Sequence, residues 1–138
     1  MSLLLESIRL HNGQFDNLSY HEQRMGRALR ELFGVNEPVS LDEFLHAGTY
    51  PPKGLYKCRV IYDAVSRQKE FVLYEPRTVD RIKVVREDHI SYHFKYANRE
   101  AIDRLFDSRG NCDDVLIIKH GRITDCSYSN IVFRTGDD

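Results

Sequence analysis

Lys95 is a candidate for a reactive amine, because it lies at the junction between a predicted strand and a predicted helix. Residues 90–94 alternate Ile, Tyr and Phe with Ser and His, which is the period-2 pattern of a strand with one buried face. Asn98 is then the predicted N-cap of a helix that Gly110 ends. Neighbouring aromatic rings would partly desolvate a lysine at this junction, and desolvation favours the free amine that attacks a carbonyl carbon. The competing interpretation is an ordinary strand-end lysine in solvent.

Arg24 is a second candidate, since its guanidinium could bind an anion. It lies one turn into a helix predicted to begin at Ser19, where Glu22 would complete a capping box. This helix is predicted to expose His21 and Arg24, and an exposed guanidinium can present two donors to an oxyanion. The alternative is a solvated row of polar side chains.

A third candidate is the cationic face of one strand. Residues 54–63 alternate so that Lys57 and Arg59 share a face, with apolar residues on the other. This face is either solvated or lines a cavity that binds an anion, such as a substrate carboxylate.

Composition limits the class of protein. The 138 residues are 41% hydrophobic, enough for one ordinary core. The 20 Lys and Arg nearly balance the 21 Asp and Glu, which excludes an extended basic surface for nucleic acid or an anionic membrane. No apolar run could cross a bilayer. Three widely spaced cysteines predict reduced thiols, no metal site and a cytoplasmic location.

The chain divides into two parts near Pro76. Residues 1–75 contain a strand (4–10), an Asn-Gly turn, the Arg24 helix, a short helix with a Ser40/Glu43 capping box, and a hairpin of strands 54–63 and 69–74. Residues 76–138 contain an apolar run (82–85), the Lys95 region, a strand (114–119) and a stretch (122–133) resembling an unfinished hairpin. The prediction is an α+β fold, with a small N-terminal α/β domain followed by the start of a second, mainly β domain.

The motifs resemble a known family when read together. They are HxxR from His21 to Arg24, a lysine followed by NR (Lys95, Asn98, Arg99), and Asp125 with Asn130 before an apolar strand. This order resembles the fold type IV pyridoxal-phosphate enzymes, which include branched-chain and D-amino-acid aminotransferases and 4-amino-4-deoxychorismate lyase. The likeness is greatest to short class IV aminotransferase-like proteins and runs through nearly all of the chain from Glu6. It implies a sandwich domain followed by a pseudo-barrel domain.

The resemblance implies a role for each matched residue. Lys95 would hold pyridoxal 5'-phosphate as a Schiff base and then move the substrate Cα proton. Arg24 would bind the cofactor phosphate, and Asp125 would stand where the family usually has a glutamate, beside the pyridine nitrogen. Arg59 and Lys57 are weaker candidates for a substrate carboxylate. Residues bracing the Asp125 loop would be Asn130, Ser127 and Ser129.

Two hypotheses follow. The first is a homodimeric enzyme acting on an amino acid or oxo acid, or on aminodeoxychorismate, by amino-group transfer or β-elimination. The second is a cofactor-free α+β binding domain, or an inactive remnant of the family. Family members complete the phosphate site with segments that would lie beyond Asp138, so the chain is expected to be C-terminally incomplete. The family also has an extra strand ahead of the segment that begins at Glu6, and we expect the chain to lack it.

Overall fold

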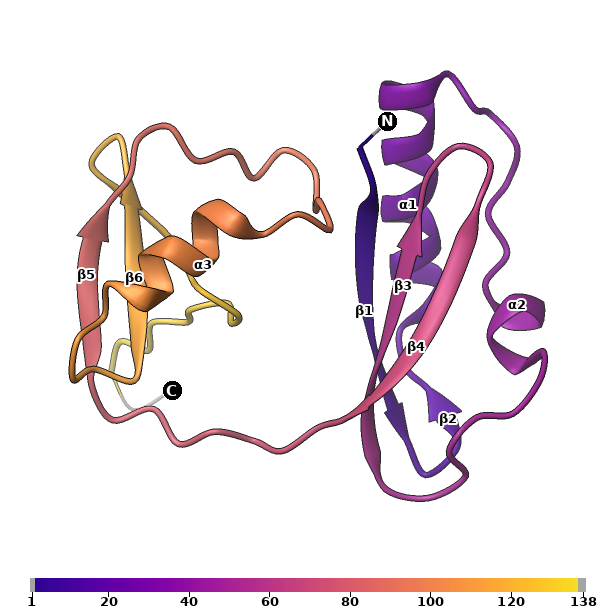
Figure 1. The fold of residues 1–138 in the computed structure, drawn as a ribbon, viewed down its shortest axis with the longest axis horizontal. Helices are drawn as coiled ribbons and strands as arrows, with labels where there is room; N and C mark the ends of the chain where they lie inside the picture. The colour runs from indigo at the N-terminus through magenta and orange to yellow at the C-terminus, as the bar shows by residue number, and fades with distance from the viewer. Residues whose placement is uncertain (1, 137–138) are drawn as a thin grey trace. The chain divides into compact units, whose positions relative to one another are not determined.

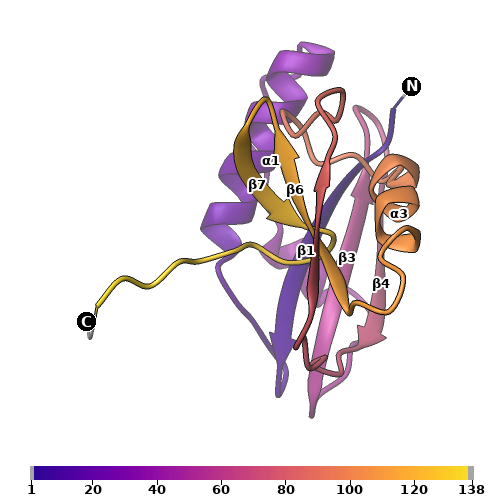
Figure 2. The ribbon, with the colours of Figure 1, turned by 90° about the vertical axis from the view of Figure 1, so that its left-hand side faces the viewer.

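The computed structural model describes residues 2–136, which form two compact units. Unit 1 contains residues 2–76 and 93–98, and unit 2 contains residues 77–92 and 99–136. Figures 1 and 2 together label the elements of both units. Those of unit 1 are β1 (Leu4–His11), β2 (Gln14–Phe15), α1 (Leu18–Phe33), α2 (Asp42–His46), β3 (Leu55–Tyr62) and β4 (Arg67–Leu73). Those of unit 2 are β5 (Ile82–Arg86), α3 (Glu100–Asp107), β6 (Asp114–Lys119) and β7 (Arg122–Cys126).

Unit 1 is an antiparallel sheet with one face covered by α1. The strand order is β2-β1-β3-β4, and β1 pairs with β3 from Leu4↔Tyr62 to His11↔Leu55. Because side chains alternate along a strand, one face carries the apolar residues and packs against α1 (Figure 1). The core of this layer consists of Leu4, Ile8, Met25, Ala28, Leu29, Leu41, Leu45, Cys58, Val60 and Tyr62. The alternation predicted for residues 54–63 is therefore confirmed.

The Asn-Gly turn connects β1 and β2 as predicted. Asn12 and Gly13 both have positive φ, 48° and 78°, the backbone that a tight hairpin requires. The strand that returns has only two residues, which pair with Leu10 and His11. On this side of β1, the residues before Leu10 therefore do not pair with β2.

Residues 95–97 fill part of this open edge, whereas the sequence predicted a strand over 90–94. Leu5 N donates to Lys95 O (2.8 Å) and Ala97 N donates to Leu3 O (2.9 Å), around a single bridge between Leu4 and Tyr96. The predicted strand is wrong because this backbone pairs with β1 only briefly. The same hydrogen bonds place 93–98 in unit 1, although the sequence assigned them to the second domain.

Both predicted capping boxes are wrong. The first helix begins at Leu18, after Asn17 in a left-handed conformation, and no side chain caps it. Glu22 instead accepts a hydrogen bond from Leu41 N (2.7 Å) and so ties α1 to the segment before α2. The second helix follows Leu41 rather than Ser40, again without a side-chain cap. The side chain of Glu22, which the local pattern assigned to capping, makes a tertiary hydrogen bond instead.

Unit 2 is a three-stranded sheet with the order β5-β6-β7. The first pair is parallel and therefore needs a crossover connection, which includes α3. Figure 2 shows β7 returning beside β6, with which it pairs antiparallel. The core of unit 2 contains the fully buried Val115 and Ile117 of β6, together with Ile90. Ile102 and Leu105 of α3 pack against this core. Two sheets with few helices confirm the predicted α+β class.

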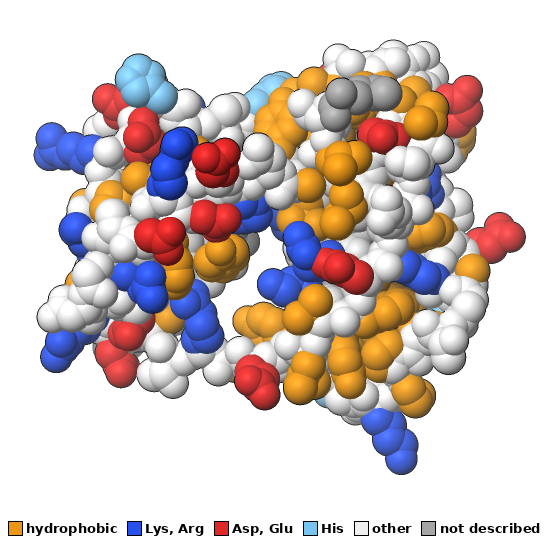
Figure 3. Space-filling view, in the orientation of Figure 1, with side chains coloured by type: hydrophobic (Ala, Val, Ile, Leu, Met, Phe, Trp, Pro, Cys, Tyr) orange, Lys and Arg blue, Asp and Glu red, His pale blue; other side chains and the backbone are white. Residues whose placement is uncertain are grey.

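The surfaces of the two units differ in character. On the face seen in Figure 3, acidic and basic side chains are interspersed over unit 2, and apolar side chains gather over the strands of unit 1. Val72, Leu73 and Tyr74, at the end of edge strand β4, are exposed. Within residues 2–136, no helix could cross a membrane, and the longest, α1, has 16 residues.

Candidate functional site

Lys95 is held against β1 by both its backbone and its side chain. Its carbonyl accepts the Leu5 amide, and its Nζ donates to Ser7 Oγ at 3.3 Å. Leu4 and Glu6 face α1, so Ser7 belongs to the opposite face of the sheet. The side chain of Lys95 is half-buried rather than extended into solvent.

Arg24 is bound to a buried carboxylate. Glu6 has no exposed surface, and its two oxygens accept from Arg24 Nε (2.8 Å) and Arg24 Nη2 (2.5 Å). His21 Nδ1 lies 2.6 Å from Glu6 Oε2, and because a carboxylate only accepts, this nitrogen is the donor. Such fork-shaped pairing fixes the plane of a guanidinium. Among the described residues, no acceptor takes the donors of Arg24 Nη1.

These contacts keep Glu6 ionised. Burial alone would raise the pKa of Glu6, but hydrogen bonds from His21 and Arg24 lower it below its ordinary value. The hydrogen bonds to Glu6 in turn raise the pKa of Arg24, against the effect of burial. The buried, ionised carboxylate of Glu6 therefore holds the guanidinium of Arg24 in a fixed orientation.

Arg59 and Lys57 lie on the sheet face that carries Ser7. Arg59 is the register partner of Ser7 on β3, and it forms an ion pair with Glu70 of β4. Lys57 is half-buried on the same face. A substrate carboxylate at Arg59 would therefore compete with Glu70.

Asp125 lies on β7 of unit 2, beside a bulge. The pairing of β6 and β7 shifts between Leu116 and Ile118, next to Thr124 and Asp125. Bulges redirect side chains and are frequent near active sites. Burial raises the pKa of Asp125, and within the described residues no cationic side chain forms an ion pair with it.

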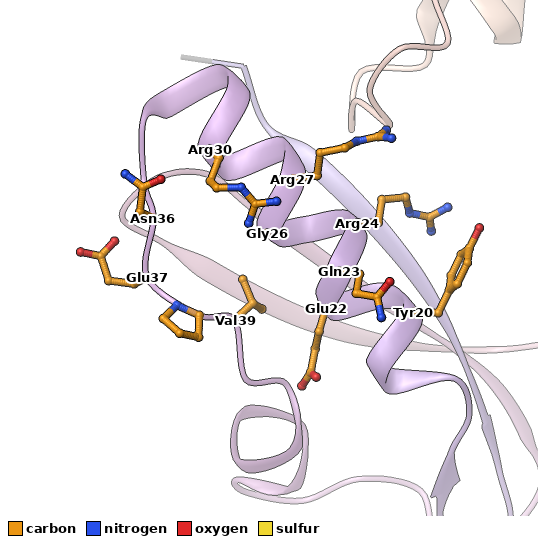
Figure 4. A pocket seen from close by; sticks show the side chains of 11 residues that line it. Tyr20, Glu22, Gln23, Arg24, Gly26, Arg27, Arg30, Asn36, Glu37 and Val39 are labelled. Carbon is orange, nitrogen blue, oxygen red and sulfur yellow. The ribbon is translucent and has the colours of Figure 1, made fainter.

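A groove of about 730 Å³ lies between α1 and the segment that leads to α2. Its lining includes Gln23, Gly26, Arg30 and residues 36–39. Figure 4 shows the guanidinium groups of Arg24 and Arg27 on the side of α1 away from this segment. Arg24 and Arg27 also line the groove, so it adjoins the contact between Arg24 and Glu6. Its lining includes neither Lys95 nor Asp125, and we do not assign the chemistry to it.

Metal chemistry has no candidate site in the described part of the chain. No group of three His, Cys, Asp or Glu side chains there could hold a metal ion. Burial raises the pKa of the Cys58 thiol to about 11, so this cysteine is unsuited to nucleophilic catalysis.

Comparison with known proteins establishes the family. No protein-family model matches the chain. An uncharacterized protein of Haemophilus influenzae is 35% identical over 135 residues, covering 96% of this chain and 72% of the relative. The crystal structure of a "putative 4-amino-4-deoxychorismate lyase" from Haemophilus somnus 129PT is 30% identical, with a TM-score of 0.90 over 99% of this chain and 73% of that one.

The chain belongs to the aminodeoxychorismate lyase family. A structure of the same description from Legionella pneumophila subsp. pneumophila str. Philadelphia 1 is 16% identical and has a TM-score of 0.66 over 91% of this chain and 56% of that one. At this identity the likeness shows the fold alone. The family belongs to the pyridoxal-phosphate-dependent group that the sequence motifs indicate.

The side chains fit the cofactor of the aminodeoxychorismate lyase family by their chemistry. An aldehyde needs an amine, which Lys95 offers. A phosphate needs hydrogen-bond donors that have no other acceptor. Glu6 accepts from Nε and Nη2 of Arg24, and no other described residue accepts from Nη1. A pyridine nitrogen needs a carboxylate that is not already in an ion pair. Asp125 meets this condition, because no cationic side chain within residues 2–136 forms an ion pair with it.

Three residues of this site were missed from the sequence. His21 was predicted to be exposed, but it is buried against Glu6. Glu6 itself gave a signal, because it lies among Leu4, Ile8 and Leu10 on the apolar face of a strand. Ser7 gave none, since a small polar residue on a half-buried face is common.

Proposed function

We propose that this chain carries out a pyridoxal-phosphate-dependent transformation of an amino acid or of aminodeoxychorismate, by amino-group transfer or β-elimination. One observation supports it above the others. Within unit 1, Lys95 and Arg24 reach neighbouring residues of one strand, Ser7 and Glu6. The two contacts lie on opposite faces of the sheet, at adjacent positions of β1 near its open edge. The family resemblance assigns Lys95 and Arg24 to opposite ends of one cofactor, and their shared attachment to this part of β1 is what supports the proposal.

When bound, the cofactor supplies an aldehyde that condenses with Lys95 and a ring that accepts electrons from the substrate Cα. Lys95 would hold the cofactor through its amine and would accept the substrate Cα proton as general base. Arg24 would bind the phosphate with the donors that Glu6 does not take, and Glu6 would keep the guanidinium from rotating away. Asp125 would stand beside the ring nitrogen, where its negative charge would favour the protonated form of that nitrogen.

The cationic side chains of Arg59 and Lys57 suggest the class of substrate. Arg59 and Lys57 share the sheet face of Ser7, and we assign them to a substrate carboxylate, with Arg59 exchanging Glu70 for it. The substrate is then a small amino acid, oxo acid or aminated chorismate derivative.

We further propose that the protein works as a cytoplasmic homodimer. Free Cys58, Cys112 and Cys126 are compatible with a reducing compartment. Exposed Val72 and Leu73 at the end of edge strand β4, with Tyr74 directly after it, offer an apolar surface for a second subunit.

Covalent trapping tests the proposed function. The protein is incubated with pyridoxal 5'-phosphate, reduced with borohydride, digested and mapped by mass spectrometry. We expect the reduced adduct on Lys95, and no adduct at that peptide in Lys95→Arg. A protein that binds no cofactor, or labels only exposed lysines such as Lys53, supports the cofactor-free binding domain instead.

Replacing Asp125 with asparagine is expected to lower turnover roughly 10- to 1,000-fold. A carboxylate at contact shifts a neighbouring pKa by about 1 to 3 units, or ~1.4 kcal/mol per unit, and the neutral amide removes this shift. The measurement is kcat with aminodeoxychorismate and with a panel of L- and D-amino acids and oxo acids. Asp107→Asn, an exposed aspartate at the end of α3, is the matched control. Unchanged kcat in Asp125→Asn would remove this residue from the mechanism.

A further inference from the structure

Ser127, two residues after Asp125, is held through each of its polar groups. Its N–H and its hydroxyl both donate to Asp114 Oδ1, at 3.1 and 2.6 Å. Its carbonyl accepts from Arg99 Nη2 at 2.6 Å. Ser127 is 2% exposed, so water does not compete for these bonds. A residue fixed from two sides in this way sets the path of the backbone on either side of it.

Asp114 is a firm anchor for this contact. It is 1% exposed, stands at the start of β6 and accepts the Val115 amide (2.7 Å) and Arg77 Nη2 (3.2 Å). Burial would raise its pKa, but hydrogen bonds from Ser127 and Val115 lower it, so the carboxylate stays charged. Hydrogen bonds to an ionised acceptor are shorter and stronger than neutral ones.

The residue before Asp125 is also fixed. Thr124 Oγ1 donates to Ile117 O (2.8 Å) and contacts the Tyr92 hydroxyl (3.2 Å). Asp125 thus lies between two anchored positions, at the point where the pairing of β6 and β7 is irregular. Without ladder pairing there, its direction depends on side-chain contacts to either side.

We propose that Asp114, Ser127 and Arg99 form a clamp of positioning residues that aims the Asp125 carboxylate at its ligand. The inference deepens the proposed function and rests on it. The clamp acts through the backbone, because Ser127 contacts Asp114 and Arg99 rather than Asp125 itself. It requires Ser127 in particular: Ser129 is exposed, and its hydroxyl makes no hydrogen bond to the described residues. Titratable groups near Asp125 are Tyr92, Cys126 and, through Tyr92, Arg99.

Two variants and one control test the clamp. Ser127→Ala removes the hydroxyl but leaves the backbone bond to Asp114, so the fold is retained. Arg99→Gln releases the Ser127 carbonyl from the other side. Ser129→Ala is the matched control. The first measurement follows the ¹³C signal of the Asp125 carboxyl against pH in the cofactor-free protein, and the second is the dissociation constant for pyridoxal 5'-phosphate.

We expect the Asp125 pKa to fall toward that of an exposed aspartate in Ser127→Ala and Arg99→Gln, because the loosened carboxyl gains water, and to stay unchanged in Ser129→Ala. The cofactor dissociation constant should rise about tenfold in both clamp variants, as for loss of a hydrogen bond to a charged group. A purely structural role would lower thermal stability and leave the titration of Asp125 unchanged, which would overturn the proposal.

The two hypotheses fail in different ways. Altered Asp125 titration in a protein that binds no cofactor supports the clamp and overturns the proposed function. Unaltered titration in a protein that binds cofactor at Lys95 overturns the clamp and leaves the proposed function standing.

Discussion

Replacing Lys95 with alanine is expected to abolish turnover, with kcat falling by about 10⁴-fold or more. The variant loses both the amine that condenses with an aldehyde and the base that takes the Cα proton. Folding should survive, because the Leu5 amide bonds to the carbonyl of residue 95 and not to its side chain. The measurement is single-turnover and steady-state kinetics with the substrate panel, with circular dichroism to verify the fold.

Lys53→Ala is the control for this experiment, because Lys53 is exposed in the loop before β3. It should retain full activity. A Lys95→Ala enzyme that still turns over substrate would end the proposal of amine chemistry at this position.

Glu6→Gln is expected to lower the free energy of unfolding by about 3 to 5 kcal/mol, as for removal of one partner from a buried ion pair. Glu6 has no exposed surface, and the neutral amide cannot match the donors of His21 and Arg24. The loss should also free Arg24 to rotate and weaken phosphate binding. Urea denaturation at pH 7 measures the stability. Glu43→Gln on the exposed side of α2 should be nearly neutral.

The same substitution should change the acid response of stability. The pKa of Glu6 is lower in the folded protein than the ordinary value of 4.5. Its contribution is therefore complete above about pH 4.5 and is lost as pH falls through the folded-state pKa. We expect Glu6→Gln to lack this part of the acid destabilisation. Parallel pH dependence of urea midpoints in wild type and variant would show that Glu6 is not the group responsible.

Strands with clear alternation were predictable from sequence. The strands 54–63 and 114–119 and the Asn-Gly turn lie where the pattern places them, because burial of one face and positive φ are properties of a few adjacent residues. The strand over 90–94 was not predictable. Its alternation is real, but no strand among residues 2–136 pairs with it, and the only bridge nearby joins Tyr96 to Leu4 of β1.

The candidate site divides in the same way. Lys95, Arg24 and Asp125 were found by residue type and order along the chain. Glu6 and Ser7, which receive the side chains of Arg24 and Lys95, were not found as partners, because each is far from its partner in sequence. Asp114 and Ser127 are related in the same way, 13 residues apart across two strands.

The amino-acid sequence alone indicated the α+β class, the family and the candidate reactive side chains, since these depend on residue type, periodicity and motif order. Tertiary structure decided which groups meet. It buried His21 on Glu6, took Glu22 from its predicted cap to Leu41, and brought Lys95 to the open edge of β1. The physical reason is that a buried polar group must find a partner wherever the fold supplies one, and that partner can lie anywhere in the chain.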